Sequence, residues 1–323
     1  MSWLHILWGK LLFESMYKIS FDRKLKQKKM KITVTGSLGN VSRVLVEKLT
    51  AEGHQVKVVS SNDGKAGEIE AVGAVACIGS LTDEDFVVRA FSGADAVYTM
   101  VPPEFSAVDY YEFADAIHRN YVRAIEKNDI RYAVNLSSIG VAFAGVAPLT
   151  RYYDLERRLN EISGLNIVHL RPAMFYNNFY GSLGMVKEQG IIGHNIPGTA
   201  EILMTHPRDI AEAAYGYLNS LSFTGRRFRS VVSDVRSGNE IAGILSGEIG
   251  KPLHWVEFPD DALMAGLLQN GFSPDSAETL IINAGRAIRE GLFDGYRDEK
   301  LSGGRKFGDF AKEFAAAYKF QGV

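Results

Sequence analysis

The sequence has few of the residues and patterns that would point to several common classes of protein. Its single cysteine, Cys77, excludes an intramolecular disulfide and a thiolate zinc cluster. Its seven histidines are scattered and form no HxxxH or HExxH pair, so we expect no metal site. The 36 basic and 38 acidic residues leave a net charge of -2, which gives no global attraction to nucleic acids or acidic membranes. A reducing cytoplasm fits this composition.

The first 29 residues differ from the rest of the chain. The apolar stretch "MSWLHILWGKLLF" is interrupted by His5 and Lys10 and is too short to span a membrane. The basic run "RKLKQKK" follows it, where a signal peptide would have a cleavage site with small residues. Three interpretations are open: a peripheral amphipathic anchor, a flexible appendage, or a leader upstream of a true start at Met30. The last two are favoured, because the folded pattern begins abruptly at Met30.

From Met30 to Pro172, short apolar strands alternate with helical segments. The strands are "KITVTG", "VKVVSS", "AVACIG", "DAVYTMV", "RYAVNLSSIG" and "LNIVHLRP". Six such units predict an α/β fold with a doubly wound parallel sheet, the NAD(P)-binding Rossmann fold. An eight-fold barrel would need more units at even spacing, and the pattern breaks after Pro172.

The domain organisation follows from that break. We expect an NAD(P)-binding domain at 30–180 and a smaller mixed α/β domain at 181–323, which is partly interleaved because elements near 201–235 return to the first. Ligands of doubly wound folds bind at the carboxyl ends of the strands. The site is therefore expected there, beneath the smaller domain.

The segment "TGSLGNVS" follows the first strand and enters a helix. In a dinucleotide-binding turn, one glycine permits the tight exit from the strand and a second lets the backbone approach a pyrophosphate. Gly36 and Gly39 fill these two positions, and Ser42 replaces the third glycine, whose role is helix packing. The alternative is a glycine turn without a ligand. The position at the head of the alternation favours dinucleotide binding.

The end of the second strand bears on the choice of cofactor. An acidic residue there would bind the ribose 2′-hydroxyl of NAD, whereas hydroxyl groups and a cation suit the 2′-phosphate of NADP. The chain has Ser60, Ser61, Asn62 and Lys65, while Asp63 is late and fits a turn former. This pattern favours NADP(H) over NAD(H), although the arginine that would decide it is not evident.

Several segments together resemble the NmrA-like atypical short-chain dehydrogenase/reductase family, in particular its NAD(P)H quinone-reductase-like branch. They are "VTGSLGNVS", "IGSLTDEDFVVRAFSGADAVYTMVPP", "VNLSSIG", "LERRLNEISGLNIVHLRPAMFYNNF", "HPRDIAEAAYGYL" and "LSGEIGKPLHWVEFP", in the order of the family. The resemblance implies a Rossmann domain, a small substrate domain and a cofactor site formed by Gly36, Ser37, Leu38, Gly39, Asn40, Val41, Ser60, Ser61, Asn62, Met100, Val101 and Pro102. The family includes reductases and also regulators that bind the dinucleotide without turning it over.

The segment "PLTRYYDLERRL" departs from the usual catalytic pattern of short-chain dehydrogenases, in which tyrosine and lysine lie four residues apart. Pairing Tyr153 with Arg157 keeps the spacing but replaces lysine with a cation that does not give up its proton. Aligning on Glu156 instead puts Tyr152 in the lysine position and Pro148 in the tyrosine position. Neither alignment preserves the pair.

The missing pair disfavours alcohol oxidation and epimerisation, which need a positioned base. Hydride transfer to a quinone mainly needs the nicotinamide held close to its acceptor. Tyr152 or Tyr153 would then supply the proton as the catalytic residue; the alternative is that both tyrosines are packing and surface residues.

Other candidates follow the fifth and sixth strands. Ser137 and Ser138 would bind the cofactor or satisfy the backbone at the strand exit. Phe175, Tyr176 and Asn177 would bind a flat acceptor, or fill a domain junction. Further residues are expected to be structural: Arg171, Asp209 in the first turn of its helix, and Cys77 as inert core.

Direct nucleic-acid binding is not expected. The basic stretches "RKLKQKK" and "GRRFRS" come without a helix-turn-helix or zinc finger, and the arginines of the second alternate along a strand. The sequence therefore predicts a cytoplasmic NAD(P)H-dependent oxidoreductase that reduces a quinone or similar flat electrophile. The alternative is a non-catalytic sensor of the NAD(P) redox state that acts through a protein partner.

Overall fold

The computed structural model describes residues 29–143, 152–294 and 303–320. The chain divides into two units, Met1–Met30 and Lys31–Val323, and the second contains the fold discussed below. Residues 1–28 lie outside the described residues, so the three interpretations of the leader stay predictions. No described helix combines the length and apolar character needed to cross a membrane.

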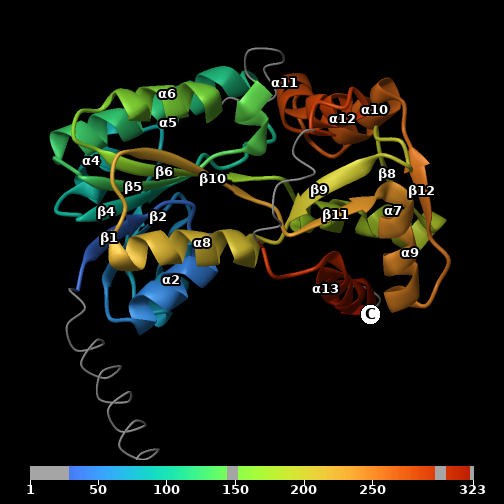
Figure 1. Cartoon of the computed structure of the whole chain (residues 1–323), viewed down its shortest axis with the longest axis horizontal. Helices are drawn as coiled ribbons and strands as arrows, with labels where there is room; N and C mark the ends of the chain where they lie inside the picture. The colour runs from blue at the N-terminus through green and yellow to red at the C-terminus, as the bar shows by residue number, and fades with distance from the viewer. Residues whose placement is uncertain (1–28, 144–151, 295–302, 321–323) are drawn as a thin grey trace, which may run out of the picture. The chain divides into compact units, whose positions relative to one another are not determined.

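A seven-stranded sheet forms the larger part of the fold (Figure 1). All its neighbouring strands pair in parallel, in the order β10-β6-β5-β4-β1-β2-β3. The strands are β1 (Lys31–Val34), β2 (Gln55–Ser60), β3 (Val75–Ile78), β4 (Ala96–Thr99), β5 (Tyr132–Leu136), β6 (Asn166–Pro172) and β10 (Arg226–Val231). This topology confirms the predicted doubly wound α/β fold. The strand order reverses between β1 and β4, which is where such folds bind their ligands.

Helices cover both faces of this sheet (Figure 1). One face carries α2 (Ser42–Ala51) and α8 (Pro207–Ser220), and the other carries α4 (Glu84–Phe91), α5 (Tyr110–Lys127) and α6 (Tyr152–Glu161). The helices begin at local signals: Asp83 and Asp109 each accept a hydrogen bond from a first-turn backbone N–H group of α4 and α5. The short helix α3 (Ala66–Ala71) precedes β3.

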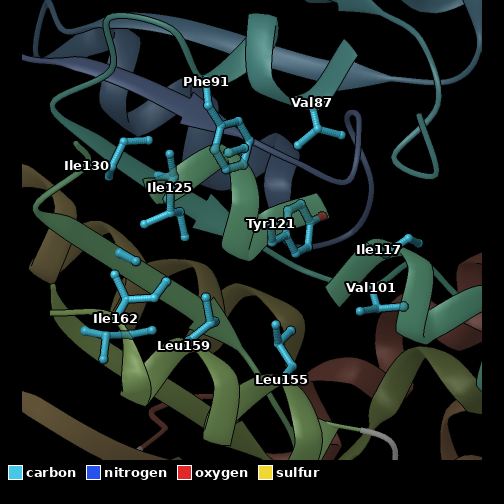
Figure 2. Close-up of a cluster of buried hydrophobic side chains, with 14 of the residues drawn as sticks. Val87, Phe91, Val101, Ile117, Tyr121, Ile125, Ile130, Leu155, Leu159 and Ile162 are labelled. Carbon is cyan, nitrogen blue, oxygen red and sulfur yellow. The ribbon is translucent and has the colours of Figure 1, made fainter. Parts of the chain in front are cut away.

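A continuous apolar core lies between the large sheet and helices α4, α5 and α6 (Figure 2). Phe91, Tyr121 and Leu155 come from these three helices in turn and are fully buried. Each such side chain stabilises the fold by about 1.5–3 kcal/mol through burial alone. The core therefore fixes α5 and α6 beside the exit of β4. The sequence analysis places cofactor-binding residues at that exit.

The remaining elements form two smaller sheets and several helices. One sheet has the order β11-β9-β7 and the other pairs β12 with β8. These strands are β7 (Met174–Phe175), β8 (Ile191–His194), β9 (Glu201–Thr205), β11 (Asp234–Ser237) and β12 (His254–Glu257). The helices are α7 (Leu183–Gln189), α9 (Gly238–Ile249), α10 (Asp260–Gln269), α11 (Pro274–Ala277), α12 (Asn283–Arg289) and α13 (Phe307–Phe320), with a π-helical turn η4 (Glu278–Ile282) between α11 and α12.

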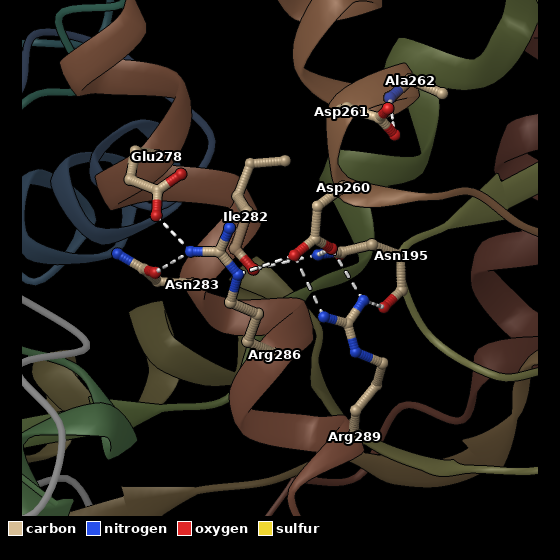
Figure 3. Close-up of polar contacts among 9 residues, drawn as sticks. All are labelled: Asn195, Asp260, Asp261, Ala262, Glu278, Ile282, Asn283, Arg286 and Arg289. Carbon is tan, nitrogen blue, oxygen red and sulfur yellow. Dashed lines mark hydrogen bonds and ion pairs between the residues drawn. The ribbon is translucent and has the colours of Figure 1, made fainter.

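A charged network attaches α10 and α12 to the end of β8 (Figure 3). The Asp260 carboxylate accepts hydrogen bonds from Asn195 Nδ2, Arg286 Nε and Arg289 Nη1, each at 2.7 Å. Arg289, together with Asn195 and Arg286, holds the pKa of Asp260 well below its usual range. Gly285 is required opposite Asn195, because a Cβ atom there would lie 1.8 Å from the Asn195 side-chain oxygen.

The two edge strands correct two predictions. Cys77 in β3 packs against the core but is only half-buried at the edge of the sheet, so the prediction of a fully buried position is wrong. Burial raises the pKa of its thiol, and its inertness stays a prediction. In β10, Arg226, Arg227 and Phe228 are all exposed, so charge does not alternate with a buried face. Both strands lie at an edge of the sheet, and an edge strand has a neighbouring strand on one side only, so its residues are less covered.

Candidate functional site

The predicted glycine turn connects β1 to α2 in a backbone conformation that favours glycine. Gly36 has φ of 89° and the next residue, Ser37, has φ of 53°. A Cβ atom at Gly36 would lie 2.9 Å from the Met100 side chain at the exit of β4. The glycine therefore allows both the tight turn and the close approach of β1 to β4.

The turn leaves backbone donors available ahead of α2. In the described part of the chain, the N–H groups of Leu38, Asn40 and Val41 donate no hydrogen bond. The helix has no capping side chain at Val41 and no acidic residue in its first turn. Unpaired N–H groups at a helix start bind anions such as pyrophosphate, so these residues fit a dinucleotide.

Ser42 has a bonding role in addition to its small size. Its hydroxyl donates to the carbonyl oxygen of Thr35 at 3.0 Å, and its side chain is buried. The Thr35 hydroxyl in turn accepts a hydrogen bond from the Met100 backbone N–H at 3.0 Å. Ser42 and Thr35 thereby hold the ends of β1 and β4 together beneath the turn.

The exit of β2 is joined to the glycine turn through serine hydroxyls. Ser37 Oγ donates to Ser60 Oγ at 3.0 Å, and the Asn62 backbone N–H donates to the same oxygen at 3.2 Å. Ser60 is buried, so it shapes the turn, whereas Ser61 and Asn62 are exposed and accessible to a ligand. Asp63 begins a short 3₁₀ turn and accepts from the Gly64 N–H, which is the turn-forming role expected for it.

Two cations lie beside this exit. Lys65 Nζ lies 2.7 Å from one carboxylate oxygen of Glu68, and Arg43 Nη2 lies 2.8 Å from the other. Sequence reasoning missed Arg43, although it lies four residues after Gly39 and its N–H group donates to the Gly39 carbonyl. Glu68 thus links a cation at the start of α2 to a cation just after the β2 exit.

Two tyrosines hold the segment that follows β4. Tyr121 donates to the carbonyl oxygen of Met100 at 2.6 Å, and Tyr152 donates to that of Val101 at 3.3 Å. Val101 is buried, while Met100 and Pro102 are half-buried. The tyrosines therefore fix the backbone of 100–102 opposite the glycine turn.

The two catalytic candidates point in different directions. Tyr152 packs against the core of Figure 2, and burial raises the pKa of its phenol to about 12. Tyr153 is 47% exposed. Four residues after these tyrosines the chain has Glu156 and Arg157, where the usual catalytic pair has a lysine. Pro148, the alternative partner position, lies outside the described residues.

The serines after β5 are engaged within the protein. Ser137 is buried and donates to Glu156 Oε1 at 2.5 Å, and Arg171 binds the same carboxylate through two nitrogens. Ser138 accepts from the Gly140 N–H at 3.2 Å and is half-buried. Ser137 and Arg171 are thus held in one network around Glu156, and contact of Ser137 or Ser138 with the cofactor stays a prediction.

The aromatic cluster after β6 is divided between core and half-exposed positions. Tyr176 is fully buried, packs on Phe307 and Phe310, and donates to the Arg305 carbonyl at 3.1 Å. These contacts make Tyr176 a core residue, which corrects the prediction that it contacts substrate. Phe175 and Asn177 are half-buried, and their contact with an acceptor stays a prediction.

Two further expectations concern acidic and metal-binding groups. Asp209 lies in the first turn of α8, as predicted, and its carboxylate accepts from Ser233 and pairs with Arg305. Among residues 29–143, 152–294 and 303–320, no three His, Cys, Asp or Glu side chains are grouped to hold a metal ion.

Known proteins match this chain along most of its length. Residues 36–200, about half the chain, match the family model described as NAD(P)H-binding. An NAD(P)H azoreductase from Xenophilus azovorans is 22% identical over 290 residues, which cover 89% of this chain and 99% of that protein.

Solved structures show the same fold. The NADPH-dependent quinone oxidoreductase of Escherichia coli, complexed with NADPH, matches with a TM-score of 0.72 at 20% identity, covering 87% of this chain and 99% of that one. NmrA, a negative transcriptional regulator solved with NAD, matches with a TM-score of 0.69 at 15% identity, covering 92% and 99%. The NmrA-like resemblance is thereby confirmed, and the chain belongs to the NAD(P)H-binding family.

Proposed function

We propose that this protein is an NADPH-dependent reductase of a quinone or a similar flat electrophile. In this proposal, residues 30–180 bind the dinucleotide, and residues 181–323 contribute to the acceptor site together with the half-buried Phe175 and Asn177, which precede them at the domain junction. The bound dihydronicotinamide would supply a hydride to the acceptor. The contributions of the chain are to bind the cofactor, to orient it and to select it.

Binding of the diphosphate rests on the turn after β1. The N–H groups of Leu38, Asn40 and Val41 are the available donors, and the open start of α2 adds a favourable dipole. Gly36 and Gly39 keep side chains away from this surface. The proposal rests mainly on this arrangement, because these backbone N–H groups fit a pyrophosphate without the help of a charged side chain.

Selection of NADP(H) rests on the β2 exit. Lys65 follows the exposed Ser61 and Asn62, its backbone N–H donates to the Asn62 carbonyl, and it shares the partner Glu68 with Arg43. No acidic residue ends the strand to bind a free 2′-hydroxyl. A guanidinium and an ammonium are suited to a phosphate. Arg43 is therefore the arginine that we propose for the 2′-phosphate, a residue that the sequence reasoning had not identified.

The source of the proton depends on whether Tyr152 can donate one. A phenol with a pKa near 12 that donates to a backbone carbonyl is a poor proton donor. We therefore assign Tyr152 the role of orienting residues 100–102, and we assign the proton to solvent. A quinone that accepts a hydride takes up its proton from water readily, so it suits a site of this kind.

The second candidate is a redox sensor that binds NAD(P) and a protein partner. Among the described residues we identify no positioned proton donor, and this favours the sensor as well. Steady-state oxidation of NADPH with a panel of quinones separates the two functions. Turnover with at least one acceptor supports the reductase. No turnover with any acceptor, together with tight binding of NADP⁺, supports the sensor.

A further inference from the structure

Glu68 lies between the two cations that flank the β2 exit. Each carboxylate oxygen has its own partner: Oε2 accepts from Arg43 Nη2 at 2.8 Å and Oε1 accepts from Lys65 Nζ at 2.7 Å. The three side chains come from three elements, namely the start of α2, the 3₁₀ turn after β2 and the first turn of α3. Both hydrogen bonds lower the pKa of Glu68, so its carboxylate is charged at neutral pH.

All three side chains are accessible to solvent. Arg43, Lys65 and Glu68 are 42%, 39% and 44% exposed. A guanidinium that binds a carboxylate offers the same planar donors to a phosphate. A phosphate that arrives at the β2 exit therefore meets cations that already have an anionic partner.

We infer that Glu68 is an internal competitor for the 2′-phosphate of NADP(H). This inference rests on the proposed preference for that cofactor. In the free protein, the single Glu68 carboxylate is paired with both Arg43 and Lys65 and offsets part of their charge. Binding of the phosphorylated dinucleotide requires the two cations to exchange Glu68 for the phosphate. NADH carries no 2′-phosphate and makes no such exchange, so Glu68 lowers the discrimination between the two cofactors.

Glu70 provides a matched control. It lies on the same short helix, is exposed, and forms no ion pair with Arg43 or Lys65 among the described residues. Glu68→Gln and Glu70→Gln remove the same charge from the same surface. A difference between these variants therefore reports the pairing of Glu68 and not the net charge of the region.

The test is the dissociation constant of NADPH, of NADH and of adenosine 2′,5′-bisphosphate for the wild type and both variants, measured by calorimetry. Exposed ion pairs contribute little each, so we expect Glu68→Gln to bind NADPH and the bisphosphate roughly two- to tenfold more tightly. NADH affinity stays unchanged in Glu68→Gln, and all three affinities stay within about twofold of the wild type in Glu70→Gln.

Three results would overturn the inference. One is weaker or unchanged binding of NADPH by Glu68→Gln, which would make Glu68 a residue that orients the cations. Another is an equal gain in Glu70→Gln, which would indicate general electrostatics. The third is a wild type that binds NADH as tightly as NADPH. Only this third result also removes the proposed cofactor preference, so the two failures are distinguishable.

Discussion

The phenol oxygen of Tyr152 lies 3.3 Å from the carbonyl oxygen of Val101, to which it donates a hydrogen bond. Tyr121 makes the equivalent bond to the preceding carbonyl, that of Met100. Two phenols thus hold the backbone of a segment that is expected to form part of the cofactor site. This relationship assigns Tyr152 to positioning and bears directly on how the protein handles protons.

Replacement of Tyr152 by phenylalanine should therefore have a modest effect. Loss of one hydrogen bond costs about 1 kcal/mol, so we expect kcat for NADPH oxidation to fall by less than about tenfold. Loss of a general acid would lower kcat by roughly 10²- to 10⁴-fold. Tyr153→Phe, at an exposed position, is the control and should match the wild type. A loss of 10²-fold or more in Tyr152→Phe would restore Tyr152 as the proton donor.

Gly39→Asp should abolish binding of both NADPH and NADH. The new carboxylate would stand beside the unpaired N–H groups that are expected to hold the pyrophosphate, and it would repel that group. Gly39 lacks a positive φ, but a Cβ atom there would lie 3.2 Å from the Gly36 carbonyl oxygen, so the turn must shift slightly and the melting temperature is measured together with the affinity. Gly216→Asp, on an open face of α8, controls for the added charge. Retained affinity in Gly39→Asp with an unchanged melting temperature would show that the turn is not the binding site.

Arg43→Gln should weaken NADPH binding and spare NADH. A charge-assisted hydrogen bond contributes about 1.5–3 kcal/mol, and 1.4 kcal/mol corresponds to a tenfold change, so we expect a loss of roughly tenfold or more in NADPH affinity. Lys48→Gln removes a cation from the last turn of the same helix and should leave both affinities unchanged. Equal losses for NADH and NADPH in Arg43→Gln would place Arg43 at the diphosphate.

Asp260→Asn should destabilise the fold by about 1–3 kcal/mol at neutral pH, because it removes the charge that binds Asn195, Arg286 and Arg289. The pKa of Asp260 is lowered in the folded state, so its stabilising effect is fully present above the unfolded pKa of about 4 and is lost as pH falls below that value.

Denaturant unfolding across this pH range measures the effect. The difference in unfolding free energy between the wild type and Asp260→Asn should shrink in acid. The neighbouring Asp261→Asn is the control, since the Asp261 side chain is exposed and accepts from the N–H group of Ala262. A difference that is constant with pH would contradict the assigned charge network.

The sequence was sufficient for features that depend on local pattern. Strand and helix periodicity predicted the parallel sheet, because each strand of a doubly wound fold is buried on both faces. Gly36 was predictable because the tight turn after the first strand requires a positive φ, which favours glycine. Asp63 was predictable as a turn former for the same local reason.

Features that depend on side chains from distant segments were not predictable. Arg43 and Lys65 meet only through Glu68, which lies on a third element. Tyr176 belongs to the core because Phe307 and Phe310 cover it from the far end of the chain. The exposure of Cys77 depends on β3 being an edge strand, which is a property of sheet order and not of the segment itself.

The central claim is that this chain binds NADPH at the turn after β1 and passes reducing equivalents to a quinone-like acceptor. Steady-state oxidation of NADPH by the full chain with a panel of quinones, with Gly39→Asp in parallel, tests it most directly. The account predicts quinone-dependent oxidation by the wild type and none by Gly39→Asp. Absence of oxidation with every quinone, or equal oxidation by the variant, would contradict it.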